Sequence, residues 1–391
     1  MKKLSLTIVL GLLLNTLHSH AQKITIIEQD YERAKVESKK QHKLILIDFY
    51  TTWCVPCKEL DELIFKDTIV TNQIAKNFIV LKYDAEKDKE HQLSLKHHIL
   101  SYPTTLILNE EQRVLNRAYG HPGEGRELVK NYFTFLDESV AKNLSNDYIK
   151  GVSSENHLDY PKFYQDYVYR IDVKNHKPAL INYWQNTSDY YGEVPFAILC
   201  YFGGGTDEVN DFFLRNKNKY KELYGSRDVD FIISMLASEK AYKAIETKDR
   251  VLFATAMKLS KENFSEKQLG NYFTIMEEKM LQAEGRWPEA AKSIALRKKQ
   301  PDFGEWAISS FSWEVVQKCN DLSVLQKCSE WMKELTDKKP TYATLDTYAQ
   351  LLAKTGKKNE AVVAMKRAIS IGKSTQENTQ SSEDWLKKNN F

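Results

Sequence analysis

One stretch near the N-terminus limits the fold of this chain more than any other: a buried-strand pattern that runs into a cysteine pair. Residues 44–50 are almost continuously apolar, which is typical of a central strand buried on both faces of a sheet. Cys54 and Cys57 follow, separated by Val55 and Pro56, and a helical pattern begins at the first cysteine. This order of strand, turn and helix predicts an α/β layer in which both sulfurs lie at the start of a helix.

Strand and helix signals continue to alternate from about residue 24 to residue 141. Strands are predicted at residues 44–50, 78–83, 104–108 and 114–119, and helices at residues 28–40, 54–65, 67–75, 88–98 and 124–138. Asp67 is expected to cap the third of these helices, because a carboxylate at that position can accept the free backbone N–H groups. We therefore place an α/β domain, a central mixed sheet flanked by helices, at residues 22–145.

After about residue 145 the strand signals fade and helical periodicity continues to about residue 371. We expect an all-helical region at residues 146–300, helical hairpins at residues 301–372 and a frayed polar tail at residues 373–391. The hairpins pair residues 306–319 with 322–335 and residues 342–354 with 360–369, about 36 residues apart, near the roughly 34-residue period of one family of helical repeats. The turn at residues 351–361 resembles that of tetratricopeptide repeats, in two degenerate units.

Charge and length limit what the chain can bind and how many domains it has. Its 391 residues suggest two or three domains. The net charge is only +3, with acidic and basic residues nearly balanced, so no global field favours nucleic acid or an anionic membrane. We expect no nucleic-acid partner.

The first 21 residues have the pattern of a secretory signal peptide. Lys2 and Lys3 precede an apolar stretch at residues 4–17, and Ser19 and Ala21 place small side chains before a cut at Gln22. The apolar stretch is shorter than the roughly 20 residues that a spanning helix needs. An uncleaved membrane anchor is the alternative interpretation.

The chain has five cysteines, too few and too scattered for a disulfide framework. We expect one reactive pair, Cys54 and Cys57, and three packing thiols at Cys200, Cys319 and Cys328. A pair with this spacing also occurs as half of a zinc site. Redox chemistry is favoured because the chain has no second such pair and because the motif joins a strand to a helix. We expect no metal and no cofactor apart from the disulfide.

The position of Cys54 at a helix N-terminus gives its sulfur a chemical role. Unpaired backbone N–H groups and the helix dipole favour an anion there, so the thiol pKa should fall to about 3.5–7.5. Cys54 is then the attacking sulfur. Cys57, one turn further along, is the more buried thiol that resolves the mixed disulfide.

Residues 24–141 resemble the thioredoxin superfamily. The stretch 46–58 is similar to the strand and active-site signature of that family, Tyr102-Pro103-Thr104 to its cis-proline loop, and Gly120 to the glycine after its last strand. From residue chemistry alone, a proline opening a buried strand is unusual, since it cannot donate to the sheet. The resemblance implies that Pro103 is cis.

The same resemblance assigns further site residues. It implies that the backbone around Tyr102 pairs with an extended substrate chain, and that Trp53, Val55, Pro56 and Pro103 also contact the substrate. Asp48 matches the buried acid near the second cysteine, where it could relay a proton, and Lys82 matches the lysine beside that acid. The alternative for Asp48 is a purely structural hydrogen-bonding role.

The Val-Pro pair between the cysteines resembles exported, thioredoxin-like reductases, and the histidine typical of strong oxidants is missing. We therefore expect a thiol–disulfide oxidoreductase acting as a reductase or isomerase in the periplasm of a Gram-negative bacterium. Its partners would be exported proteins that contain cysteine, a membrane-bound or other thiol electron donor, and a protein bound by the helical region. The alternative is a helical-repeat scaffold protein with an accessory thioredoxin-like domain.

Two groups of residues outside the motif receive structural interpretations. His91, His97 and His98 are read as a solvated helix face. Three tryptophans of the helical hairpins are read as core residues, with a peptide-binding groove as the alternative: Trp306, Trp313 and Trp331.

Overall fold

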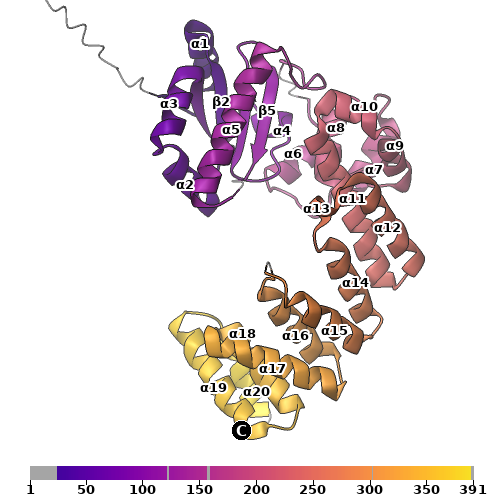
Figure 1. Ribbon diagram of the computed structural model, residues 1–391. Coiled ribbons are helices and arrows are strands. Elements are labelled where there is room, and N and C mark those ends of the chain that lie inside the picture. Colours follow the sequence, from indigo (N-terminus) through magenta and orange to yellow (C-terminus); the bar gives the residue numbers. More distant parts are fainter. Residues whose placement is uncertain (1–23, 121–122, 156–158, 302, 389–391) are drawn as a thin grey trace, which may run out of the picture. The chain divides into compact units, whose positions relative to one another are not determined.

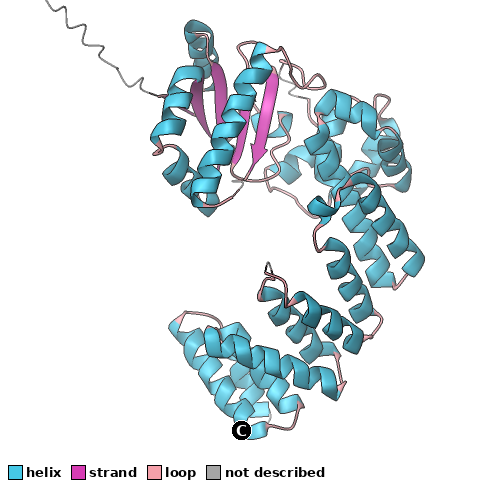
Figure 2. Cartoon of the chain, in the orientation of Figure 1, coloured by secondary structure: helices cyan, strands magenta, loops and turns pink. Residues whose placement is uncertain are grey.

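Two units make up the chain, with residues 1–232 in the first and residues 233–391 in the second. The structure is a computed structural model that describes residues 24–120, 123–155, 159–301 and 303–388. Figure 2 shows that the strands of the described residues lie together in one sheet and that the rest of the described chain is helices and loops. The signal peptide predicted at residues 1–21 lies outside the described residues.

A five-stranded mixed sheet in the order β1-β3-β2-β4-β5 forms the base of the first unit. Its central strand β2 runs parallel to β3 and antiparallel to β4, and six of its seven residues are buried, as the apolar sequence predicts. The strands are β1 (Thr25–Glu28), β2 (Leu44–Tyr50), β3 (Phe78–Asp84), β4 (Thr104–Leu108) and β5 (Val114–Tyr119). The predicted α/β fold class is confirmed, although the sequence analysis missed the short edge strand β1.

Helices cover both faces of this sheet. They are α1 (Tyr31–Gln41), α2 (Val55–Ile64), α3 (Thr68–Asn77), α4 (Leu93–Lys96) and α5 (Gly125–Leu144), with a 3₁₀ turn η1 (Ala85–Lys87). Figure 1 shows α2, α3 and α5 together on one face, where Leu60, Ile74 and Leu136 join Leu46 of the sheet in one core. Asp67 caps α3 as predicted, accepting hydrogen bonds from two backbone N–H groups.

The first unit also contains the beginning of the helical region. Its helices are α6 (Lys162–Val168), α7 (His176–Asn186), α8 (Glu193–Phe202), α9 (Asp207–Arg215), α10 (Lys217–Tyr224) and the start of α11 (Ser226–Thr247). Aromatic side chains fill the space between them; Phe196 of α8 and Tyr224 of α10 stack with ring centroids 3.6 Å apart. We call residues 160–232 the helical layer.

A buried polar network joins the helical layer to the sheet. Asp228 of α11 lies 2.9 Å from Arg117 of β5, and its other oxygen accepts a hydrogen bond from Tyr119 at 3.1 Å. His98 Nε2 lies 3.0 Å from the same carboxylate. Burial alone would raise the pKa of Asp228, but Arg117 and His98 outweigh it and hold this pKa far below its usual range.

The predicted helix at residues 88–98 is wrong in extent, and the interpretation of its histidines as a solvated face is wrong for two of them. Only residues 93–96 are helical. His97 and His98 are buried, as is Lys96, which forms an ion pair of 2.9 Å with Glu193 of α8. The helical layer covers this face, a burial that local sequence could not indicate because it depends on residues more than 90 positions away.

The second unit is helical in all of its described elements. After the end of α11 it contains α12 (Arg250–Asn263), α13 (Glu266–Leu269), α14 (Tyr272–Ala283), α15 (Trp287–Arg297), α16 (Trp306–Lys318), α17 (Leu322–Lys338), α18 (Tyr342–Lys354), α19 (Lys358–Ser374) and α20 (Gln380–Lys388). The helices of both predicted hairpins are present as α16 with α17 and α18 with α19; their likeness to tetratricopeptide repeats stays a prediction. Over the described residues, no helix combines the length and apolar character needed to span a bilayer.

Two expectations for the second unit are wrong. Trp331 is buried as predicted, but Trp306 is 70% exposed and Trp313 is 43% exposed, because only one side of α16 faces the core. Part of the tail expected to be frayed forms α20, and Trp385 and Leu386 of this helix pack against the α18–α19 core.

We predict that Asp228→Asn lowers the free energy of unfolding of the first unit at pH 7 by at least about 2 kcal/mol, because Arg117 is left buried without its counter-ion. The pKa of Asp228 is depressed in the folded state, so its contribution is present above the unfolded pKa of about 3.9 and is lost as the pH falls below it. Urea unfolding should show the difference between wild type and variant shrinking below about pH 4. Asp337→Asn, in an exposed ion pair with Lys333, is the control; an equal loss there, or a pH-independent difference, would contradict the prediction.

Candidate active site

Cys54 and Cys57 are joined by a disulfide bond at the start of α2, with their Cα atoms 5.3 Å apart. Cys54 is the N-cap residue, and its sulfur accepts a hydrogen bond of 3.1 Å from the backbone N–H of Cys57. Pro56 lies in the first turn, where it costs the helix no hydrogen bond because that N–H would be unpaired anyway. The backbone thus presents a donor to the sulfur that the sequence predicts to be the nucleophile.

The side chains beside the disulfide differ sharply in exposure. Both cysteines are nearly buried, whereas Trp53 is 56% exposed and Val55 is 62% exposed. Exposed apolar side chains of this size next to a reactive pair form a natural contact surface for another protein. These are two of the residues that the sequence analysis assigned to substrate binding.

The loop containing Tyr102 and Pro103 lies beside this surface. The peptide bond between these two residues is cis, and the backbone N–H of Gly120 donates a hydrogen bond of 2.7 Å to the Pro103 carbonyl. The rings of Tyr102 and Trp53 meet edge to face, with centroids 6.4 Å apart. The structure therefore brings together the cysteine motif and the proline loop, which are separated by about 45 residues of sequence.

Asp48 and Lys82 occupy neighbouring positions on β2 and β3 and form an ion pair of 2.5 Å. Burial raises the pKa of the Asp48 carboxyl, although Lys82 opposes the shift. The second carboxylate oxygen of Asp48 has no hydrogen-bond partner among the described residues. A buried carboxyl with a raised pKa and one free oxygen can take up and release a proton.

The sequence analysis missed a third member of this group. Asp61 of α2 also forms an ion pair with Lys82, and it lies four residues after Cys57, so both project from the same side of the helix. That spacing was the only signal in the sequence. Asp61 and Asp48 together hold the pKa of Lys82 above its ordinary value against the effect of burial.

Glu86 is a second residue that the sequence analysis did not single out. Its carboxylate accepts a hydrogen bond of 2.9 Å from the indole N–H of Trp53, which fixes the ring beside the disulfide. The residue lies in the turn η1, far from the cysteines in sequence, so nothing in the local pattern indicated the contact.

The remaining cysteines are packing residues, as predicted. Cys200, Cys319 and Cys328 are free and buried. Burial raises the pKa of each thiol, that of Cys328 to about 12, which keeps these thiols protonated and unreactive at neutral pH.

Comparisons with known proteins agree with this geometry. A protein-family model described as thioredoxin-like matches residues 26–110. Residues 26–110 are a thioredoxin-like domain. The recognition of a thioredoxin-like domain from sequence is confirmed.

The relatives cover only part of the chain. It is 34% identical over 76 residues to Thioredoxin-1 of Drosophila melanogaster, which spans 19% of this chain and 66% of that protein. It is 31% identical over 84 residues to the thiol:disulfide interchange protein DsbD of Vibrio cholerae, spanning 21% of this chain and 14% of that protein. A solution structure of a disulphide-isomerase candidate from Bacteroides thetaiotaomicron matches 29% of this chain and 93% of its own, with 33% identity and a TM-score of 0.26. The chain thus spans less than two thirds of these two sequence relatives.

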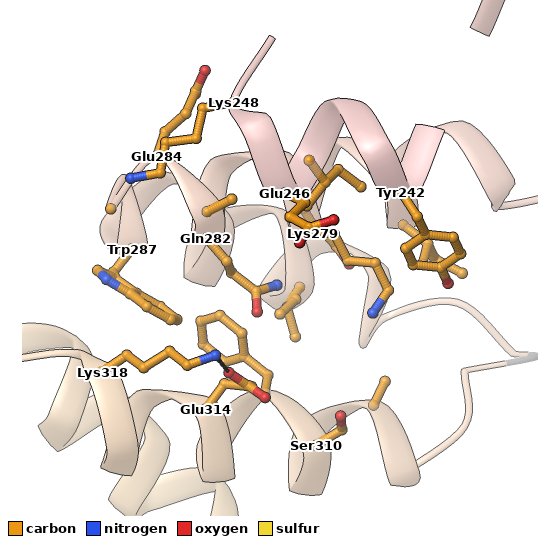
Figure 3. Close-up of a pocket in the computed structure, with 18 of the residues that line it drawn as sticks. Tyr242, Glu246, Lys248, Lys279, Gln282, Glu284, Trp287, Ser310, Glu314 and Lys318 are labelled. Carbon is orange, nitrogen blue, oxygen red and sulfur yellow. Dashed lines mark ion pairs between the residues drawn. The ribbon is translucent and has the colours of Figure 1, made fainter. Parts of the chain in front are cut away.

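The second unit contains a pocket that is not part of the disulfide site. It has a volume of about 670 Å³ and lies between α11, α14, α15 and α16. Figure 3 shows Glu246, Lys279 and Gln282 facing Glu314 and Lys318 across it, with the last two joined in an ion pair. Its lining contains equal numbers of acidic and basic residues, and the peptide-binding groove stays a prediction.

We predict that reduced Cys54 is alkylated by iodoacetamide with a pH midpoint below about 7.5, because the N–H of Cys57 and the start of α2 stabilise its thiolate. The pH dependence of the rate in the Cys57→Ser variant isolates this sulfur. In the Cys54→Ser variant, Cys57 should react at least tenfold more slowly at pH 7, as roughly expected of a thiol of ordinary pKa. A midpoint near the ordinary value of about 8.5 for Cys54 would contradict the prediction.

Proposed function

We propose that this protein is a thiol–disulfide oxidoreductase that reduces or isomerises disulfide bonds in exported proteins. The observation that carries the proposal is the Cys54 sulfur at the N-terminus of α2, bonded to a partner sulfur one turn away and bordered by an exposed tryptophan. The similarity to a thioredoxin and to a thiol:disulfide interchange protein supports the same chemistry.

In the reducing direction the reaction has two exchange steps. The Cys54 thiolate attacks one sulfur of the substrate disulfide, forming a mixed disulfide and releasing the other substrate sulfur as a thiolate. Cys57 then loses its proton and attacks Cys54, which closes the Cys54–Cys57 bond and releases the second substrate thiolate. Two electrons pass from the protein to the substrate, and a dithiol donor must return them by the reverse exchange.

Asp48 is proposed to accept the proton of Cys57. Its raised pKa and its unpartnered oxygen suit that role, and Lys82, held by both Asp48 and Asp61, would stabilise the carboxylate when the proton leaves. The structural alternative for Asp48, a residue that only satisfies hydrogen bonds, fits less well because one of its oxygens has no partner in the described part of the chain.

Trp53, Val55, Pro56, Tyr102 and Pro103 are proposed to bind the substrate. The first three are chain neighbours of the cysteines, and Tyr102 meets the Trp53 ring. An extended chain could pair with the peptide groups around Tyr102 in the manner of an added strand. Substrates of this kind are proteins with accessible disulfides. The electron donor is proposed to be another dithiol protein, in the membrane or outside the cytoplasm.

The proposal places the protein in the periplasm. The support is the sequence of residues 1–21, with its basic start, its short apolar stretch and its small residues before Gln22. The choice of reductase or isomerase over oxidase is supported by the Val-Pro pair between the cysteines, which resembles exported reductases.

We predict that the wild-type protein reduces insulin with dithiothreitol as electron donor and that Cys54→Ser abolishes this activity, because the sulfur proposed to attack the substrate is removed. Cys57→Ser should accumulate a mixed disulfide with the substrate, seen as a reducible mass increase by mass spectrometry. The matched control is Cys200→Ser, a buried cysteine outside the site, which should keep wild-type activity. Equal activity in wild type and Cys54→Ser would contradict the enzyme hypothesis and favour the helical scaffold.

We predict that Asp48→Asn slows resolution of the mixed disulfide at least tenfold at pH 7 while leaving the alkylation midpoint of Cys54 nearly unchanged. The reason is that a positioned proton acceptor contributes roughly a hundredfold or more to such steps. Stopped-flow tryptophan fluorescence from Trp53 can follow the step, and the loss should diminish as the pH rises and hydroxide replaces the carboxylate. A pH-independent loss would indicate the structural role instead.

A further inference from the structure

The loop that carries Tyr102 and Pro103 is held from its far side by the helical layer. This layer is not part of the region matched by the thioredoxin-like family model, which ends at residue 110. Figure 1 shows α6 and α8 next to α4, the short helix that precedes the loop, and both helices contact it.

Two tyrosines of the layer donate hydrogen bonds to backbone carbonyls of the segment leading into the loop. The Tyr164 hydroxyl of α6 donates to the Leu95 carbonyl at 2.7 Å. The Tyr201 hydroxyl of α8 donates to the Ile99 carbonyl at 2.5 Å. The Leu95 carbonyl lies in the last turn of α4, where it also accepts a hydrogen bond from the backbone N–H of His98. Ile99 lies three residues after this helix and three residues before Tyr102.

Two further polar contacts with the layer hold the same segment. Lys96 pairs with Glu193 of α8. His98 meets Asp228 of α11, which also binds Arg117 and Tyr119 on β5. Beyond the segment, the Thr104 hydroxyl donates to the Ser101 carbonyl at 2.7 Å, so the loop is tied on both sides.

The layer also reaches Tyr102 itself. This side chain is mostly buried, which raises its pKa to about 12, and Arg170 at the end of α6 opposes the shift. Tyr201 lies close enough to Tyr102 to interact electrostatically with it. The layer thus acts electrostatically on the side chain that meets Trp53.

We propose that the helical layer, residues 160–232, positions the substrate-binding loop of the thioredoxin-like domain, with Tyr164 and Tyr201 as positioning residues. Neither hydroxyl takes part in thiol exchange. They set where the backbone of Tyr102 and Pro103 lies relative to Cys54, and thus how well an extended protein chain pairs with it. A small disulfide that makes no such pairing does not depend on the layer.

The test is the double variant Tyr164→Phe/Tyr201→Phe, which removes both hydroxyls and keeps both rings. The matched control is Tyr220→Phe/Tyr224→Phe, since these buried tyrosines donate to the Tyr190 and Tyr191 carbonyls, inside the layer. The test variant should raise KM for insulin roughly tenfold, as expected for two lost hydrogen bonds, with kcat and the rate toward hydroxyethyl disulfide within about twofold of wild type. The control variant should leave all three values unchanged.

The kinetic test of this inference rests on the proposed function, because it measures disulfide reduction. Hydrogen exchange followed by mass spectrometry does not, and therefore tests the positioning role separately. Peptides covering residues 93–104 should exchange at least tenfold faster in the test variant and at the wild-type rate in the control. Faster exchange with no disulfide reduction by the wild type would uphold the positioning role and reject the enzyme. Unchanged exchange in the test variant, or an equal rise in KM in both variants, would overturn the positioning role.

Discussion

The hydrogen bond from the Cys57 N–H to the Cys54 sulfur is the contact on which the rest of the site depends. It exists because β2 ends just before the cysteine motif and α2 begins within it, so that the sulfur takes the place of a capping oxygen. A helix N-terminus favours an anion, and a thiolate is the reactive form of cysteine. Local backbone geometry thus determines which of the five thiols can react.

Much of this could be predicted from sequence because the signals are local. The apolar run of β2, the carboxylate cap of α3 and the spacing of Cys54 and Cys57 each report the conformation of a few neighbouring residues. The three packing cysteines were also predictable, since they are too few and too scattered along the chain for a disulfide framework. The edge strand β1 was missed because four residues with one buried side chain leave almost no pattern.

The parts that sequence analysis missed depend on contacts between distant segments. Asp61 of α2 belongs to the site because it pairs with Lys82 of β3. Glu86 of η1 belongs to it because it accepts a hydrogen bond from Trp53. His97 and His98 are polar by sequence yet buried. For His98 the partners are Asp228 of α11 and Phe196 of α8, about 100 or more positions later in the sequence. For Trp306 and Trp313 the prediction was wrong in the opposite direction, since both were expected in the core and are exposed. Helical spacing identifies one face of a helix but not what covers that face.

The central claim is that Cys54 and Cys57 form a reversible redox pair that donates electrons to protein disulfides. Equilibration of the full chain with defined ratios of reduced to oxidised glutathione, followed by alkylation and mass spectrometry, measures its potential most directly. The account predicts a two-electron potential of about −180 mV or lower, the range of thioredoxin-like isomerases and reductases. A potential near −120 mV, roughly that of a strong disulfide-forming oxidant, would contradict it.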